Sequence, residues 1–434
     1  MTDSTSGSAA FTFGGSGPRA AVRAANWVLG RARQFGWGSE LSYRRIRDDA
    51  QRRTGLQDWG GEEVVEPLGR LVDAFDREAG LTPFGRVFVR EILIECAQNR
   101  LRAREYVRVH PEVRDAPLLP ALIVVGMPRT GTTLLYNLLC QDASARPLLG
   151  WESLQPASPS SGSDWINRRR LKAQWISRSA NWLAPSLRWV HPFTVDGPEE
   201  CTWLMTNTFV SPVFSMMGHI PSYTSWLWDV DESVWDRAYR DYRIQLSVLQ
   251  HQRGGGHWVL KSPVHFISLA PLLRALPDSR IVVTRRDPRE VVPSACSLFA
   301  VFRAIGAERV DPLSLGAEVL ADLARGLRRM DQVSAANPDR VCSVEYRDVV
   351  ADKVRSVRLI HEHFGLPFDP DMEARIGRWV ARDRHAPLHR YGLDQFGISE
   401  VELRAHFPDI VASAGAGTDA RCGAASESSR TELA

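Results

Sequence analysis

Two glycines enclose a short turn that could hold an anion. Gly126 ends the apolar run of residues 121–125, and Gly131 comes five residues later, directly before Thr132 and Thr133. Glycine lets the backbone turn tightly enough for several N–H groups to face one anion, and a helix that starts there adds the positive end of its dipole. The residue types are those of a strand, a phosphate-binding loop and a helix.

This loop departs from the usual nucleotide-triphosphate loop at one position. That loop reads G-x-x-x-x-G-K-[ST], and its lysine reaches the β- and γ-phosphates. Here Thr132 stands at the lysine position and the cation comes earlier, as Arg129. The sequence therefore predicts a site for a smaller anion, held by N–H groups, hydroxyls and one arginine. The candidate ligands are Arg129, Thr130, Gly131, Thr132 and Thr133.

Two further apolar runs end in basic side chains. Residues 257–260 lead to Lys261, and residues 280–284 lead to Arg285 and Arg286. Helix signals follow each run, and the order strand, helix, strand, helix favours parallel strands whose carboxyl ends form a common crevice. We expect an α/β fold with a P-loop-like parallel sheet flanked by helices. The loop, Lys261 and Arg286 should all face the crevice.

Two motifs in this order resemble the co-substrate site of sulfotransferases that use 3′-phosphoadenosine 5′-phosphosulfate (PAPS). Pro-Arg-Thr-Gly-Thr-Thr at 128–133 resembles the loop that binds the 5′-phosphosulfate, and residues 282–294 resemble the segment that binds the 3′-phosphate. The resemblance covers roughly residues 118–400. It implies a sulfotransferase fold with PAPS as co-substrate, and PAPS has no adjacent polyphosphate that would require a metal.

The resemblance also assigns roles outside the loop. Arg286 and Ser294 match an arginine and a serine that bind the 3′-phosphate, and Tyr346 matches a tyrosine near the adenine. Lys261 matches a lysine near the bridging oxygen. We therefore expect Lys261 and Arg129 to stabilise the negative charge that develops on the leaving phosphate.

Sulfuryl transfer to a hydroxyl also needs a base. Cytosolic members of the family use a histidine two residues after the lysine, but Pro263 stands there in this sequence. Tyrosyl-protein sulfotransferases use a glutamate placed much like Glu152, which follows Trp151 at an expected strand end. Glu152 is the first candidate, and we expect Trp151 to raise its pKa towards neutrality. The alternatives are His265, His191 and the pair Glu199 and Glu200.

The residues and the resemblance together predict transfer of a sulfuryl group from PAPS to a hydroxyl by in-line displacement. A P-loop kinase is one alternative, although Thr132 at the lysine position argues against it. A catalytically silent nucleotide-binding protein on the same fold is another. Aromatic side chains between residues 151 and 230 favour an apolar acceptor pocket, but sugars also stack on tryptophan. The acceptor is therefore expected to be a small molecule, a lipid or a carbohydrate.

The N-terminal part of the chain is expected to be helical. Apolar residues recur there at helical spacing, and Thr82 followed by Pro83 is typical of a helix start. Pro198, with two glutamates after it, predicts another helix start. The expected organisation is a disordered tail at 1–20, a helical region at 21–117, a sulfotransferase domain at 118–412 and a flexible tail at 413–434.

Composition sets broad limits on function. Of the 434 residues, 44% are hydrophobic and 24% are charged, fractions typical of a globular protein. A net charge of +3 gives no case for nucleic-acid binding. The 6 cysteines are not spaced as a zinc site, and neither a signal peptide nor a transmembrane segment is evident. We expect a cytoplasmic protein, and the sequence is silent on its oligomeric state.

Overall fold

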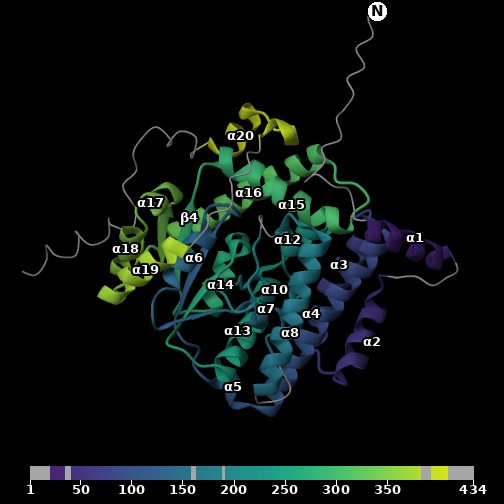
Figure 1. Ribbon diagram of the computed structural model, residues 1–434, viewed down its shortest axis with the longest axis horizontal. Helices are drawn as coiled ribbons and strands as arrows, with labels where there is room; N and C mark the ends of the chain where they lie inside the picture. The colour runs from purple at the N-terminus through teal and green to yellow at the C-terminus, as the bar shows by residue number, and fades with distance from the viewer. Residues whose placement is uncertain (1–19, 35–40, 158–162, 188–190, 383–391, 409–434) are drawn as a thin grey trace, which may run out of the picture.

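A five-stranded parallel sheet with the order β2-β3-β1-β4-β5 forms the centre of the fold (Figure 1). Its strands are β1 (Ala121–Gly126), β2 (Ala145–Pro147), β3 (His257–Lys261), β4 (Arg280–Arg285) and β5 (Val341–Glu345). The structure is a computed structural model that describes residues 20–34, 41–157, 163–187, 191–382 and 392–408. The tails expected at 1–20 and 413–434 lie outside these residues, apart from Ala20.

Both faces of the sheet are buried. Because successive side chains of a strand point to opposite faces, each strand contributes side chains to two apolar clusters. In β1, Ile123 and Val125 join one apolar cluster, whereas Leu122 and Val124 join another. The second cluster includes side chains from α6 (Thr132–Leu139), α18 (Lys353–His363) and α19 (Pro370–Arg382). The first includes side chains from α13 (Glu232–Gln252), α14 (Leu269–Ala275), α15 (Pro288–Gly306) and α16 (Pro312–Ala335). The predicted α/β fold is therefore confirmed.

Helices precede the sheet in the chain and share its core. They are α1 (Ala20–Gln34), α2 (Tyr43–Thr54), α3 (Val65–Arg77), α4 (Pro83–Val109) and α5 (Glu112–Asp115), with a short 3-10 turn at Glu62–Val64. As predicted, α4 starts at the Thr82-Pro83 pair: Thr82 Oγ1 accepts a hydrogen bond from the Gly85 N–H at 2.9 Å. Leu93 and Ile94 of α4 lie in the same cluster as Ile123 of β1, so this region and the sheet have one apolar core.

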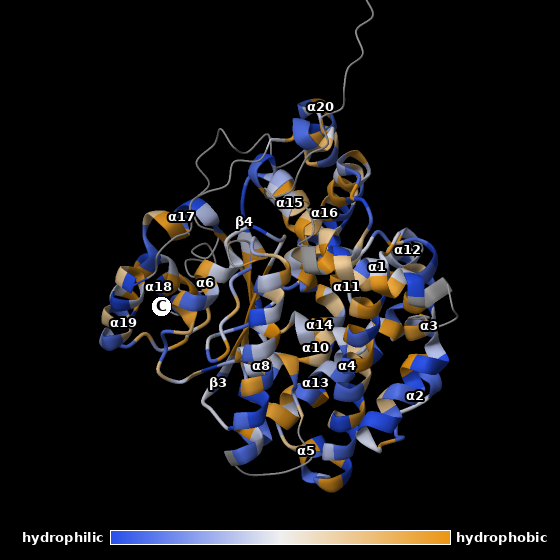
Figure 2. Cartoon of the chain, turned by 45° about the vertical axis from the view of Figure 1, so that its right-hand side comes forward, coloured by the Kyte–Doolittle hydropathy of each residue, from blue (hydrophilic) through white to orange (hydrophobic). Residues whose placement is uncertain are grey.

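The remaining helices follow the first strand in the chain. They are α7 (Gly150–Leu154), α8 (Ser163–Leu183), α10 (Thr202–Thr206), α11 (Val213–Met217), α12 (Pro221–Asp229), α17 (Tyr346–Ala351) and α20 (Glu400–His406), with 3-10 turns at Pro263–Ile267 and Asp394–Phe396. In Figures 1 and 2, α15, α16 and α20 lie at one end of the molecule and α5 at the opposite end. Among the described residues, no helix has the length and apolarity needed to cross a bilayer.

Two local expectations are wrong. Pro198 does not start a helix: it forms an antiparallel bridge with Leu149, and the Glu199 N–H donates to Leu148 O at 2.8 Å, so this segment is extended. Glu152 does not follow a strand but lies within α7. In both places a pairing between segments about fifty residues apart replaces the local propensity of the chain.

The packing of α4 on α15 gives a first prediction. A Cβ added to Gly85 would lie 2.0 Å from the carbonyl oxygen of Gly306, the last residue of α15. Because the two backbones would have to separate, Gly85→Ala should lower the free energy of unfolding by roughly 1–3 kcal/mol in urea denaturation.

The matched control is Gly69→Ala in α3, where nothing lies within 4 Å of the added Cβ. Here the change removes a flexible residue from a helix and should raise the free energy of unfolding by about 0.5–1 kcal/mol. Equal effects of the two variants would contradict the account of this contact.

Candidate active site

The loop between β1 and α6 has a backbone that constrains its residues. Arg129 and Gly131 take positive φ angles of 73° and 85°. A Cβ on Gly131 would lie 2.3 Å from the Tyr346 ring, and one on Gly126 would lie 2.5 Å from Thr284 Oγ1. Both glycines are therefore required, and the unusual φ of Arg129 is the kind of local strain found at ligand sites.

The threonines of the loop have different surroundings. Thr132 and Thr133 are the first two residues of α6, so their N–H groups lie at the positive end of that helix. The Thr130 side chain is fully buried, where its hydroxyl donates to Met127 O at 2.7 Å and shares a hydrogen bond with Thr284 Oγ1 at 2.6 Å. The predicted role of this hydroxyl as a ligand is thus corrected: it fixes the loop to β4.

The strand register brings Lys261 to the loop. Val124 of β1 pairs with Lys261 of β3, and Lys261 Nζ donates to Thr133 Oγ1 at 3.2 Å. The same ammonium forms an ion pair with the Glu200 carboxylate. Lys261 is buried, with 2% of its surface exposed. A charged pair thus lies beside the first turn of α6.

The other predicted co-substrate residues gather at the end of β4. The Arg286 guanidinium lies 4.4 Å from the centre of the Tyr346 ring, and Arg286 Nη1 donates to the Arg129 carbonyl at 3.2 Å. Arg129 Nε donates to Ser294 Oγ at 3.0 Å. Arg286 also pairs with Glu290, which is largely exposed. The structure therefore brings together Arg129, Arg286, Ser294 and Tyr346.

A cavity of about 360 Å³ lies among these groups. Its polar side is lined by Arg129, Gly131, Thr132, Thr133, His191, Glu199, Glu200, Lys261, Arg286 and Tyr346. Its other side is mainly apolar, with Trp203, Val213, Met216, Met217, Leu227, Trp228, Phe266, Leu298, Phe299, Phe302, Val319 and Leu323. Trp203 and Trp228 belong to the aromatic residues between 151 and 230 from which the sequence predicted an apolar pocket. The contribution of α15 and α16 was not predicted, because an apolar helix face that lines a cavity has the same pattern as one in the core.

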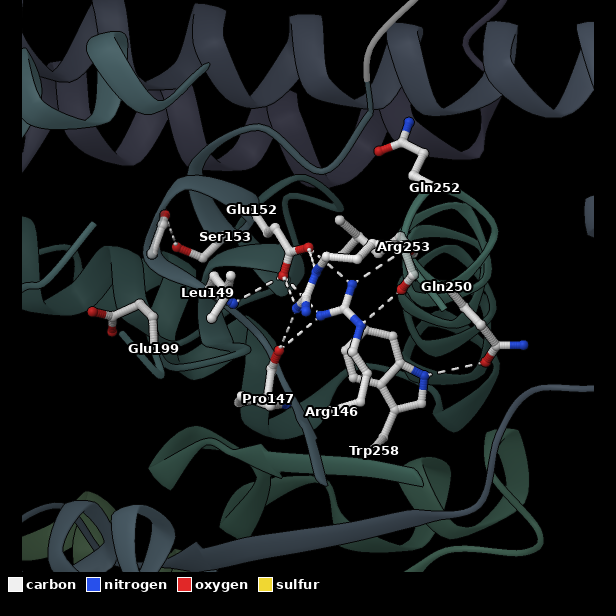
Figure 3. Close-up of polar contacts among 12 residues, drawn as sticks. Arg146, Pro147, Leu149, Glu152, Ser153, Glu199, Gln250, Gln252, Arg253 and Trp258 are labelled. Carbon is white, nitrogen blue, oxygen red and sulfur yellow. Dashed lines mark hydrogen bonds and ion pairs between the residues drawn. The ribbon is translucent and has the colours of Figure 1, made fainter. Parts of the chain in front are cut away.

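Glu152 lies outside the lining of this cavity. Only 1% of its surface is exposed, and Figure 3 shows its carboxylate held by Arg146 and Arg253. Arg146 Nη1 donates to Glu152 Oε2 at 2.8 Å and Arg146 Nη2 donates to Oε1 at 2.9 Å. Arg253 Nε also donates to Oε1, at 2.9 Å. Burial would raise the pKa of Glu152, but the two arginines outweigh it and lower that pKa. The expected raised pKa is wrong, and this carboxylate serves an internal ion-pair network rather than as a base in the cavity.

His265 is also removed from the cavity. It is fully buried, and its Nδ1 lies 2.8 Å from the Tyr239 hydroxyl. Burial lowers the pKa of His265 to about 3. Its neutral ring packs between Tyr239 and Tyr242, at 5.6 and 5.5 Å between ring centres.

His191, Glu199 and Glu200 do line the cavity. His191 Nε2 lies 3.3 Å from Glu199 Oε1, which also accepts the Glu200 N–H at 2.8 Å. Burial acts to lower the pKa of His191, but the Glu199 carboxylate outweighs it, so that the pKa is raised. Two of the alternatives considered from the sequence, His191 and the glutamate pair, therefore lie where a base could act.

Comparison with known proteins decides the family. Residues 120–370 match the model of the sulfotransferase family. The chain belongs to this family. A protein of Mycobacterium bovis named omega-hydroxy-beta-dihydromenaquinone-9 sulfotransferase Stf3 is 25% identical to this sulfotransferase over 310 residues, 67% of this chain and 74% of the relative. A Mycobacterium tuberculosis protein of the same name matches equally well.

Two solved structures resemble this sulfotransferase over most of its length. Sulfotransferase STF9 from Mycobacterium avium is 27% identical, with a TM-score of 0.77 over 86% of this chain and 96% of that one. Sulfotransferase STF1 from Mycobacterium tuberculosis is 26% identical, with a TM-score of 0.73 over 84% of this chain and 98% of that one.

The corrected position of Glu152 gives a prediction for this sulfotransferase. Glu152→Gln would leave Arg146, whose side chain is fully buried, without its counter-charge. The variant should lose roughly 3–5 kcal/mol of unfolding free energy, as in other broken buried pairs, while the folded fraction keeps most of its turnover. Because the pKa of Glu152 is lowered in the fold, its contribution is present at neutral pH and is lost as the pH falls below the ordinary value of 4.5.

A matched control is Glu91→Gln, which breaks the exposed pair with Arg53. This change should cost at most about 1 kcal/mol. Denaturation curves and turnover per folded molecule measure both variants. Normal stability with abolished turnover in Glu152→Gln would restore Glu152 as the base.

Proposed function

We propose that this sulfotransferase transfers the sulfuryl group of PAPS to the hydroxyl of a lipid-like alcohol. The observation that carries the proposal is a single cavity with two chemically different sides. Loop N–H groups, Lys261 and Arg286 line one side, and mainly apolar side chains line the other. The first side suits an anionic donor and the second an apolar acceptor, with the reacting atoms between them.

The residues on the polar side fit a doubly phosphorylated adenosine. The N-terminal end of α6 and Arg129 would hold the 5′-phosphosulfate. Arg286 and Ser294 each form a hydrogen bond with Arg129 and would hold the 3′-phosphate. The Tyr346 ring packs against the loop at Gly131 and against the Arg286 guanidinium, and an adenine could stack on it. The close approach of Gly131 and Tyr346 supports this assignment.

The transfer exchanges one bond to sulfur for another. The acceptor oxygen forms a bond to sulfur, the bond from sulfur to the 5′-phosphate oxygen breaks, and the acceptor proton passes to a base. Lys261 would stabilise the charge that develops on the leaving phosphate oxygen. In-line displacement places the acceptor oxygen and the leaving oxygen on opposite sides of sulfur. The base must therefore lie next to the acceptor hydroxyl, whereas Lys261 acts at the leaving oxygen.

Glu200 is the proposed base. Its carboxylate lies in the cavity wall and forms the ion pair with Lys261. When the negative donor draws the lysine ammonium towards its phosphate, the carboxylate is released to accept a proton. His191 is the second candidate, but the Glu199 carboxylate raises its pKa and so favours the protonated ring, which cannot accept a proton.

The apolar side of the cavity favours a lipid over a carbohydrate. A sugar would need a hydrogen-bonding partner for each buried hydroxyl, and the helices that supply the apolar lining add only Thr202, Ser215, Thr224 and Asp322 as polar residues. An alkyl chain would gain about 0.8 kcal/mol for each methylene it buries. Asp322 is one polar group there, hydrogen-bonded to Trp228 Nε1 at 2.7 Å, and burial raises its pKa to about 6. The relative Stf3 is named for an omega-hydroxylated menaquinone, which is consistent with this class.

The test combines donor binding with product formation. The full chain should be stabilised against heat by 3′-phosphoadenosine 5′-phosphate without Mg²⁺, and should form sulfated products from PAPS and primary alcohols of increasing chain length, detected by mass spectrometry. Lys261→Ala should keep the stabilisation but lose roughly 100-fold or more of product formation.

Two results would contradict the proposal in different ways. Stabilisation by ATP with Mg²⁺, and not by the adenosine bisphosphate, would exclude PAPS as the donor. Stabilisation by the bisphosphate without product from any alcohol or sugar would indicate a catalytically silent protein.

The base assignment gives a separate prediction. Glu200→Gln keeps the shape of the side chain and should lower kcat by about 100-fold or more, with bisphosphate binding retained. His191→Asn should lower kcat by about tenfold or less, since it only alters the neighbour of Glu199. The reverse order of effects in steady-state kinetics would assign the base to His191.

A further inference from the structure

Two histidines and a glutamate meet around α5, the helix that Figures 1 and 2 show at the end of the molecule opposite α15 and α16. His110 caps α4, Glu112 is the first residue of α5, and His251 lies in the last turn of α13. Glu112 Oε1 lies 3.3 Å from His110 Nδ1 and 3.6 Å from His251 Nε2. One donor atom from each side chain lies within 4.8 Å of the other two. None of the three lines the cavity.

The donor set and its spacing are those of a zinc site. Two imidazole nitrogens and one carboxylate oxygen are usual zinc ligands, and donor atoms around a tetrahedral ion lie about 3.3 Å apart. The two separations from Glu112 Oε1 are close to that value. The side chains are 36%, 58% and 40% exposed for His110, Glu112 and His251, so an ion could enter directly from solvent.

A neighbouring tyrosine fixes one of the histidines in a suitable orientation. The Tyr106 hydroxyl lies 2.9 Å from His251 Nδ1. A metal-bound histidine typically donates its second ring N–H to such a partner, which leaves the lone pair of the other nitrogen for the ion. Here that other nitrogen is Nε2, the atom near Glu112. The Tyr106 ring also packs on His110, at 4.6 Å between ring centres.

We propose that His110, Glu112 and His251 bind one Zn²⁺ ion, with water as the fourth ligand. The ion joins the C-terminal ends of α4 and α13, which belong to distant parts of the chain. Only the folded chain brings the three ligands together, so zinc binding should stabilise the fold. The site is separate from the transfer reaction, for which no metal was predicted.

The test uses the full chain without an affinity tag, stripped of metal and titrated with zinc chloride in a calorimeter. One equivalent should bind, and the unfolding temperature should rise. His110→Gln or His251→Gln should weaken binding by roughly tenfold or more, and Tyr106→Phe by about tenfold. His406→Gln, at a half-buried histidine in the last turn of α20, is the matched control and should leave zinc binding unchanged.

Two further measurements keep the proposal open to refutation. The metal-free variants should unfold like the metal-free wild type, which shows that a weaker affinity is not a folding defect. Bound Co²⁺ should give visible bands of tetrahedral coordination without a thiolate charge-transfer band. The proposal is overturned by absence of binding, by zinc binding that survives both histidine changes, or by a thiolate band, which would place the metal on cysteine.

Discussion

The parallel register of β3, β1 and β4 is the constraint on which the site depends. Val124 pairs with Lys261 on one side of β1, and Gly126 pairs with Thr284 on the other. Three strands therefore end at one edge, and each delivers a different group to it: an ammonium, a loop that ends at the start of α6, and a guanidinium. A slip of one residue between β1 and β3 would turn Lys261 to the opposite face of the sheet. The burial of both sheet faces makes such a slip costly, so core packing and site geometry are set together.

The ion pair at this edge is largely shielded from water, although one of its members faces the cavity. Lys261 is buried, yet its partner Glu200 lies in the wall of a cavity rather than in a closed core. A buried ion pair adds little to stability by itself, because desolvation offsets the attraction between the charges. The pair of Glu152 with Arg146 and Arg253 has a different setting, since it lies outside the cavity lining and supports the fold. Glu200 and Glu152 thus both pair with cations, but only Glu200 lines the cavity, where a substrate could reach it.

Local patterns in the sequence were sufficient to predict which loop and which basic residues lie at the carboxyl edge of the sheet. The change from strand to loop to helix at 121–135, and the basic residues after two later strands, were found because each signal lies within a few residues. Glu152 was misassigned because its partner Arg253 lies 101 residues away and approaches only in the fold. Phe299 and Val319 were missed as cavity residues because nothing in an apolar helix pattern tells a core face from a cavity wall. The zinc ligands were invisible for a similar reason: His251 meets His110 and Glu112 only through the packing of α13 beside α5.

The most direct measurement is a crystal structure with 3′-phosphoadenosine 5′-phosphate and a long-chain primary alcohol. The account predicts the 5′-phosphate at the N-terminal end of α6, the 3′-phosphate between Arg286 and Ser294, and the alkyl chain along the apolar side. The alcohol oxygen should lie next to Glu200 and Lys261. Phosphates bound away from the carboxyl edge of the sheet, or an alkyl chain outside the cavity, would contradict it.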